Sequence, residues 1–107
     1  MRRGDVVTVA AEGYAGKPRP AVVLQSDAFS ETASVTLCLM TTTDTGSPLF
    51  RLRVEPGEAL PLREASFIMA DKVMTVRRAK VGPVIGRLPR ETQVALDRAL
   101  VVFLGIG

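Results

Sequence analysis

The sequence contains no histidine, and this absence excludes more chemistry than any other feature of its composition. Histidine is the usual acid and base of ribonucleases, the base of most serine and cysteine triads, and a frequent zinc ligand. With a single cysteine, the chain also cannot form an internal disulfide or a cysteine-based zinc site. No glycine-rich phosphate loop or dinucleotide motif follows a predicted strand. The sequence therefore predicts no metal and no other cofactor, and leaves carboxylates, hydroxyls and arginines for catalysis.

Long apolar runs are also missing. The longest, residues 99–104, is far shorter than the roughly 20 residues that a membrane-spanning helix needs. No signal-peptide profile opens the chain. Cys38 lies in an apolar stretch, where a free thiol behaves as a small hydrophobic group, and this pattern favours a reducing compartment. We therefore expect a cytoplasmic protein with no membrane association.

The 107 residues, 47% of them hydrophobic, predict one globular domain over residues 1–107. A domain of this size exposes much of its surface, which makes a homodimer plausible. The net charge of +3 is a mild excess, but six basic residues stand between positions 72 and 90 with no acidic residue among them. This run is either a surface for a polyanion or a set of solvated strand and turn side chains.

Short valine-rich or alternating segments bounded by glycine and proline predict β-strands. They cover residues 5–10, 19–25, 34–41, 50–54, 66–70 and 73–76. A bend or bulge is expected at Asp71 and Lys72, and Pro83 restricts its segment to a sheet edge or a loop. Pro89 and Gly105 mark the start and end of a terminal helix. The pattern predicts a mainly β fold, a small and strongly bent antiparallel sheet or barrel packed by a C-terminal helix.

Three residues match the needs of RNA cleavage without a metal ion. That reaction needs a base for the 2′-hydroxyl, donors for the phosphate oxygens and a proton for the leaving 5′-oxygen. Arg19, at the start of a predicted buried strand, offers a planar fork of donors to a phosphate. Thr41 offers a hydroxyl and Asp71 a carboxylate. Asp71 acts as the base only if its pKa is raised, and the neighbouring Lys72 lowers it instead.

Each of these residues also has a structural interpretation. Arg19 can cap a strand end and pair with Asp5 or Asp27. Thr41 is an ordinary β-branched residue at the end of a strand. Asp71 can be a turn residue or a member of a surface ion pair.

Other side chains are candidates for binding RNA rather than cleaving it. Lysines and arginines on a groove rim supply affinity that is largely independent of sequence, and the candidates are Lys17, Arg77, Arg78 and Lys80. Tyr14, in a glycine-containing loop, can stack on an unpaired base. The four phenylalanines are expected in the core or an interface; they are Phe29, Phe50, Phe67 and Phe103.

Residues 4–9 (GDVVTV) and 19–24 (RPAVVL), separated by a small polar loop, resemble the start of the MazF/PemK family of toxin endoribonucleases. The resemblance implies the SH3-like barrel of that family, with a C-terminal helix. In the family, an arginine that opens the second strand and a threonine pair that closes the third are implicated in cleavage. Here they correspond to Arg19 and to Thr41 with Thr42. Asp71 takes the place of an acidic residue in a later strand.

Two departures from the family pattern stand out. Some relatives carry an arginine two residues before the acidic residue, where this chain has Met69, and some use a histidine in the first loop, which this chain lacks. A mechanism centred on Arg19 and Thr41 survives both losses.

The resemblance implies a metal-independent, sequence-selective endoribonuclease that acts as a homodimer on single-stranded mRNA. It leaves a 2′,3′-cyclic phosphate and a 5′-hydroxyl, and a cognate MazE-like antitoxin neutralises it. One alternative is a CcdB-like toxin that binds DNA gyrase through terminal residues such as Ile106 and needs no Arg19. Another is a non-catalytic SH3-like module that binds nucleic acid and leaves it intact.

Overall fold

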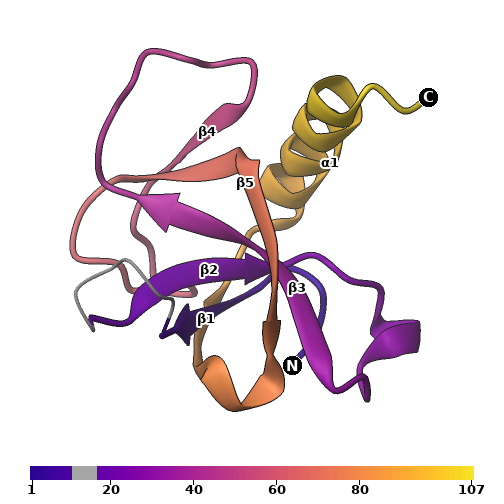
Figure 1. The fold of residues 1–107 in the computed structure, drawn as a ribbon. Helices are drawn as coiled ribbons and strands as arrows, with labels where there is room; N and C mark the ends of the chain where they lie inside the picture. The colour runs from indigo at the N-terminus through magenta and orange to yellow at the C-terminus, as the bar shows by residue number, and fades with distance from the viewer. Residues whose placement is uncertain (11–16) are drawn as a thin grey trace.

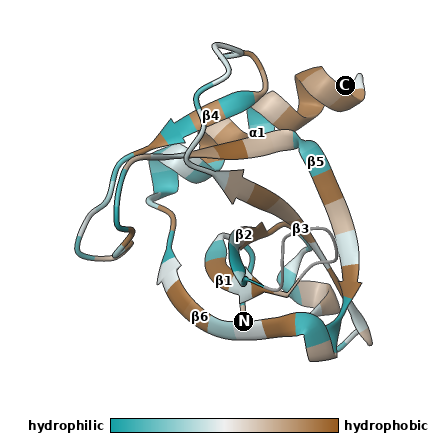
Figure 2. Ribbon diagram, turned by 60° about the vertical axis from the view of Figure 1, so that its left-hand side comes forward, coloured by the Kyte–Doolittle hydropathy of each residue, from teal (hydrophilic) through white to brown (hydrophobic). Residues whose placement is uncertain are grey.

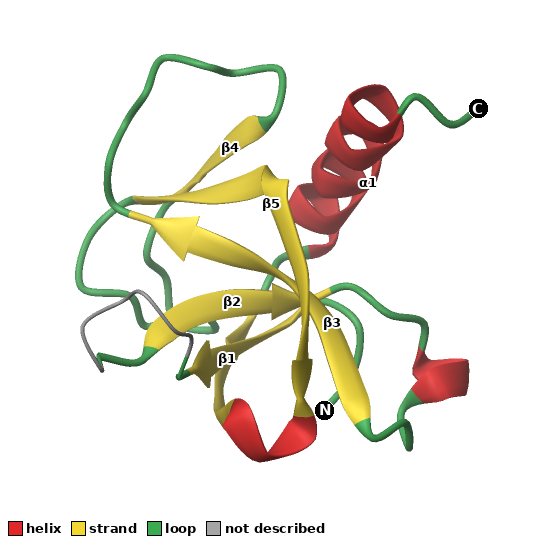
Figure 3. Ribbon diagram, in the orientation of Figure 1, coloured by secondary structure: helices red, strands yellow, loops and turns green. Residues whose placement is uncertain are grey.

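The computed structural model describes residues 1–10 and 17–107. These residues form a β-sheet followed by one α-helix (Figure 1). The elements are β1 Asp5–Val9, β2 Arg19–Val23, β3 Ser34–Thr41, β4 Arg51–Val54, β5 Ser66–Arg77, β6 Val81–Arg87 and α1 Arg90–Leu104. Figure 3 shows two short 3-10 turns, η1 Asp27–Phe29 and η2 Arg78–Lys80, in the connections that lead into β3 and β6.

The strands form one antiparallel sheet in the order β4-β5-β3-β2-β1-β6. In Figure 2, β5 and β6 curve around β1 and β2, so the sheet is rolled rather than flat. Within the described residues β6 is an edge strand, which tolerates the missing N–H of Pro83. The predicted mainly β fold, a strongly bent sheet with a C-terminal helix, is confirmed.

β5 changes register in its middle. Thr41 pairs with Phe67 and Met40 with Ile68, whereas Cys38 pairs with Val73. A single β3 residue therefore faces residues 69–72 of β5, and this irregularity contains Asp71. The extra residues bend the strand, as bulges do, so its first half is buried on both sides and its second half is largely exposed. The bend predicted at Asp71 and Lys72 is confirmed.

Alternation along the strands divides the interior into two cores. The helix-side core lies between the sheet and α1, which packs against β4 and β5. It contains Val6, Val22, Cys38, Met40, Val54, Leu60, Ile68, Ala70, Leu88, Leu96 and Leu100. The barrel core lies on the other face, inside the rolled sheet. It contains Val7, Val9, Ala21, Val23, Val35, Leu37, Leu39 and Met69.

The helix has the ends that its sequence predicts. Pro89 is the residue that precedes it, with a φ of −57°, and Gly105 ends it in the left-handed region, with a φ of 70°. Leu96 and Leu100 are buried, whereas Phe103 is 45% exposed, so the apolar spacing extends beyond the part of the helix that packs on the sheet. Among the residues that the structure describes, no helix combines the length and apolar character needed to cross a bilayer.

Candidate nucleic-acid-binding site

Side chains of four neighbouring strands line up at one end of the sheet. The β2–β3 pairing ends at Ala21 and Leu39. Arg19 and Thr41 lie two residues beyond that pair on their own strands, each on the face of its strand that Ala21 and Leu39 share. Thr41 pairs with Phe67 of β5, and Phe67 pairs with Arg53 of β4. Cross-strand partners share a face, and this is the face of the barrel core. We call these four residues (Arg19, Thr41, Phe67 and Arg53) the site row.

The two predicted threonines lie on opposite faces. The Thr41 hydroxyl is in the site row and accepts a hydrogen bond from the backbone N–H of Thr43 at 3.2 Å. Thr42 is exposed and lines a cavity of about 330 Å³ together with Pro18 and Pro20. Thr41 is therefore placed to act with Arg19, whereas Thr42 faces a different hollow.

Asp71 forms an ion pair with Arg51 across two strands. The Arg51 Nε donates to Oδ1 at 2.7 Å and its NH2 group to Oδ2 at 2.9 Å, and the two side chains are only 13% and 16% exposed. These hydrogen bonds lower the pKa of Asp71, with the charges of Arg51 and Lys72 acting in the same direction. The pKa of Asp71 is therefore shifted in the direction opposite to the one that base catalysis requires. An ion pair was predicted as the alternative, but at the surface, and the observed pair is mostly buried.

Arg51 is a site residue that the sequence did not single out. It pairs with Met69, the position at which some relatives carry an arginine, so a guanidinium reaches Asp71 from the neighbouring strand. The strict alternation of residues 50–54 does place Arg51 and Arg53 on one face. Only the β4–β5 register shows that this is the face of Asp71.

Arg53 is held much more loosely than Arg51. Its Nε donates to Glu55 at 2.7 Å, but the two side chains are 58% and 65% exposed. The guanidinium carbon lies 5.8 Å from the centre of the Phe67 ring, within cation–π range. Phe67 is buried, as predicted, so the ring is a fixed support beneath an exposed charge.

Only some of the predicted rim residues lie near the site row. Lys17 is exposed and lies two residues before Arg19. Lys80 comes directly before Val81, and Val81 and Arg19 pair with the same residue, Val9, from its two sides. Arg77 instead pairs with Ser34, at the far end of β3 from Thr41. Tyr14 lies outside the described residues.

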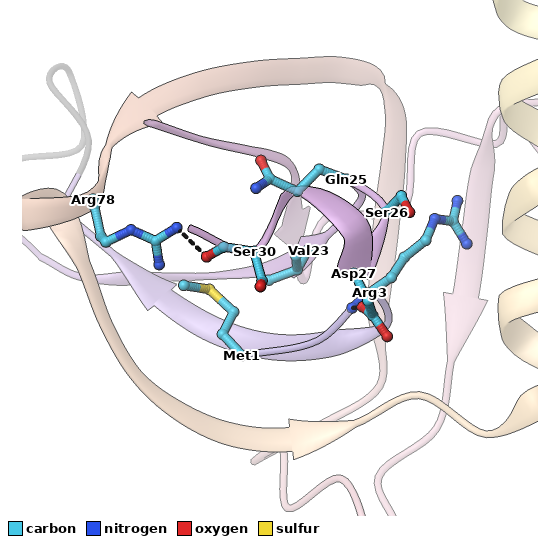
Figure 4. A pocket seen from close by; sticks show the side chains of 8 residues that line it. All are labelled: Met1, Arg3, Val23, Gln25, Ser26, Asp27, Ser30 and Arg78. Atoms are coloured by element: carbon cyan, nitrogen blue, oxygen red, sulfur yellow. Dashed lines mark hydrogen bonds between the residues drawn. The ribbon is translucent and has the colours of Figure 1, made fainter. Parts of the chain in front are cut away.

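Arg78, predicted to contact RNA, donates hydrogen bonds within the protein. Its Nε donates to the carbonyl of Thr32 at 2.9 Å and its NH2 group to the carbonyl of Ser30 at 2.6 Å. Figure 4 shows the guanidinium pointing toward Ser30 beside a very small cavity, of about 10 Å³, that Met1 and Arg3 also line. Its donors tie η2 to the segment that follows η1.

The two carboxylates proposed as structural partners of Arg19 bind other groups. Asp5 accepts from the Arg87 guanidinium at 2.8 Å and from the backbone N–H of Arg2 at 2.8 Å. Asp27 accepts from the backbone N–H of Arg3 at 2.7 Å. Both contacts lie at the opposite end of the β1–β2 pair from Arg19.

The fold and the site row define a small β-barrel protein with arginine, threonine and lysine side chains at one end of its sheet. Comparison with known proteins narrows this class. A family model described as a PemK-like, MazF-like toxin of type II toxin–antitoxin systems matches residues 2–104. The probable endoribonuclease MazF of Mycolicibacterium smegmatis is 52% identical over 108 residues, which cover 100% of this chain and 99% of that protein. The chain belongs to the PemK/MazF toxin family.

Solved structures agree on the fold. An endoribonuclease in complex with its cognate antitoxin, from a mycobacterial species, has a TM-score of 0.80 at 26% identity, covering 100% of this chain and 97% of that one. The Mycobacterium tuberculosis toxin MazF-mt6 has a TM-score of 0.83 at 21% identity, covering 96% and 98%. The family predicted from residues 4–9 and 19–24 is confirmed, and these findings do not support a gyrase-binding toxin or a non-catalytic module.

Proposed function

We propose that this MazF-family endoribonuclease toxin cleaves single-stranded mRNA at selected sequences without a metal ion, with Arg19 and Thr41 at the scissile phosphate. The observation that carries the proposal is the register of β2 and β3, which leads to Arg19 and Thr41 at one end of the sheet and on one face. Lys17 and Lys80 flank this end and supply affinity for the RNA backbone.

The reaction needs no covalent intermediate with the protein. The 2′-oxygen attacks the neighbouring phosphorus as its proton passes to water, and the bond from phosphorus to the 5′-oxygen breaks as that oxygen takes a proton from water. The products are a 2′,3′-cyclic phosphate and a 5′-hydroxyl. Arg19 donates N–H groups to the non-bridging oxygens, where negative charge grows in the transition state, and the Thr41 hydroxyl donates in the same place.

Asp71 serves this site by positioning rather than by removing the proton. Its lowered pKa makes it a weak base, and both of its oxygens accept hydrogen bonds from Arg51. The pair keeps the Arg51 guanidinium fixed beside the site row. We therefore attribute the rate acceleration to orientation and electrostatic stabilisation.

A homodimer and an antitoxin complete the proposal, and both fit a toxin that works among the mRNAs of the cytoplasm. The end of the chain exposes Val102 (64%), Leu104 (54%) and Ile106 (58%), and a groove of about 410 Å³ runs beside Leu104 and Ile106. Such an apolar surface is typical of a contact between subunits. A related endoribonuclease has been solved with its cognate antitoxin, which supports a MazE-like partner here.

The function is tested with purified, antitoxin-free protein and a long single-stranded RNA in EDTA, followed by mapping of the fragment ends. The wild type is compared with Arg19→Ala and with Arg90→Gln, which removes one exposed charge at the start of α1. We expect discrete cuts with 5′-hydroxyl ends from the wild type and Arg90→Gln, and none from Arg19→Ala. Intact RNA with a folded wild-type protein would overturn the proposal.

A further inference from the structure

A cavity beside the site row takes no part in the proposed cleavage step. Its volume is about 560 Å³, ample for one nucleobase. Its walls come from β4, from β5 and from the connection between β3 and β4. The lining residues include Arg51, Arg53 and Phe67 of the strands and Asp44 and Ser47 of the connection.

Two arginines of this cavity differ in their freedom. Arg51 is bound through two hydrogen bonds to Asp71 and is nearly buried, so it forms a rigid wall. Arg53 has an exposed ion pair with Glu55, and exposed pairs of this kind are weak and exchange readily. Arg53 can therefore realign on a ligand, whereas Arg51 stays in place.

Arg53 and Phe67 together form a stacking surface. The Phe67 ring is 7% exposed and lies 5.8 Å from the Arg53 guanidinium carbon, so the ring supports one side of the planar group. The Arg53 side chain is 58% exposed, so a ligand can reach the guanidinium from the solvent. Proteins bind unpaired RNA bases by stacking them on aromatic rings and on guanidinium planes.

The site row also sets the distance between this surface and the cleavage position. Arg53 and Arg19 stand in the same row on strands β4 and β2, with β5 and β3 between them. Neighbouring strands lie about 4.8 Å apart, so Arg53 stands across the sheet from Arg19 rather than at the cleaved bond itself. A base at Arg53 therefore belongs to a nucleotide that flanks the cleaved bond.

We propose that this cavity is a base-binding subsite in which an unpaired base flanking the cleaved bond stacks on the guanidinium of Arg53. Asp44, whose Oδ1 accepts from the backbone N–H of Gly46 at 2.8 Å, lines the same cavity with Ser47, and both side chains carry oxygens that can accept hydrogen bonds from the edge of that base. The inference rests on the proposed endoribonuclease function. It makes Arg53 a residue that determines which sequences are cut.

The test uses a synthetic RNA that contains the mapped cleavage sequence, and copies in which each flanking nucleotide in turn is abasic. The enzymes are the wild type, Arg53→Gln, Arg53→Lys and the control Arg90→Gln, each checked for folding by thermal melting. For the wild type, we expect one abasic position to lower kcat/KM by about 5- to 100-fold, the range for loss of one stacked base. Arg53→Gln should lower kcat/KM on intact RNA by a similar factor and be insensitive to that abasic position.

The remaining variants separate stacking from charge. Arg53→Lys keeps the charge but loses the planar group, so it should behave like Arg53→Gln, whereas Arg90→Gln should match the wild type. The subsite is overturned if Arg53→Gln keeps the wild-type sensitivity to every abasic position, or if Arg53→Lys behaves like the wild type. Failure of the wild type to cut any RNA would instead overturn the proposed function, and the subsite with it.

Discussion

Arginines gather both near Asp5, at one end of the β1–β2 pair, and in the site row, and the two regions use them differently. At the end near Asp5, the Arg87 guanidinium donates to Asp5 and to the carbonyl of Arg3, and Arg3 donates to the carbonyl of Leu24 and to Asp97. At the site end, Arg53 is mostly exposed and held by one exposed carboxylate. An arginine whose donors are bound by acceptors of the protein has a structural role. An exposed guanidinium that packs on an aromatic ring can instead bind a ligand.

The sharpest test of this comparison is Arg19→Ala. We expect kcat/KM for RNA to fall by about 100- to 1,000-fold, as when a donor to a developing oxyanion is removed. Cleavage assays measure the loss, and thermal melting on the same samples ensures that it is counted per folded molecule. Undiminished cleavage by folded Arg19→Ala would remove Arg19 from the reaction.

At the other end, Arg87→Gln should affect stability instead. It removes a charged donor from Asp5, whose side chain is 9% exposed, and we expect the free energy of unfolding to fall by about 2–3 kcal/mol. Cleavage per folded molecule should be unchanged. Urea unfolding measures the first effect, and Arg90→Gln is the control, with an expected change within about 0.5 kcal/mol. Equal losses in both variants would contradict the structural role.

Thr41→Val sharpens the comparison within the site row. The change keeps the shape of the side chain and removes the hydroxyl, and the loss of one hydrogen bond of about 1 kcal/mol predicts a reduction in kcat/KM of about fivefold. Thr42→Val is the matched control, since Thr42 faces the other hollow. Steady-state kinetics on one RNA should separate the two variants, and equal effects would remove Thr41 from the site.

The smallest effect concerns Asp71 and acid pH. Its pKa is lowered in the folded protein, so its contribution to stability is fully present above the unfolded value of about 3.9 and is lost as the pH falls through the folded value. The difference in unfolding free energy between the wild type and Asp71→Asn should therefore be constant from pH 5 to 7 and shrink below about pH 4. Urea unfolding at several pH values tests this, and a constant difference down to pH 2 would contradict it.

Local patterns in the sequence were enough to predict the first four strands, the terminal helix and the irregularity at Asp71, whereas β5 was predicted as two segments and β6 only as a sheet edge or a loop. Ser34–Thr41 has the bounds predicted from its β-branched and apolar residues, and the helix lies between the predicted proline and glycine. Each of these features depends on neighbours along the chain. The alternation that places Arg51 and Arg53 on one face is equally local.

The contacts of the site were harder to predict because they depend on register across long connections. The pair of Arg51 and Asp71 joins residues 20 positions apart, on strands separated by an irregular segment. The basic run after Lys72 is continuous in sequence, but the chain turns through η2 and divides it. Arg77 lies opposite Ser34, Arg78 binds backbone carbonyls, and Lys80 lies near the site end.

The position of Cys38 gives the protein an internal chemical reporter. The thiol is fully buried on β3 between β2 and β5, and burial raises its pKa to about 12, with the charge of Asp71 acting in the same direction. An alkylating reagent needs an exposed thiolate, so it reacts only when the centre of the sheet opens. A partner that binds the native chain stabilises it, so the opened form becomes less populated. The reduction grows with the ratio of the partner's concentration to its Kd. The rate of alkylation of one buried sulfur therefore measures binding of an antitoxin or an RNA without a label at the site itself.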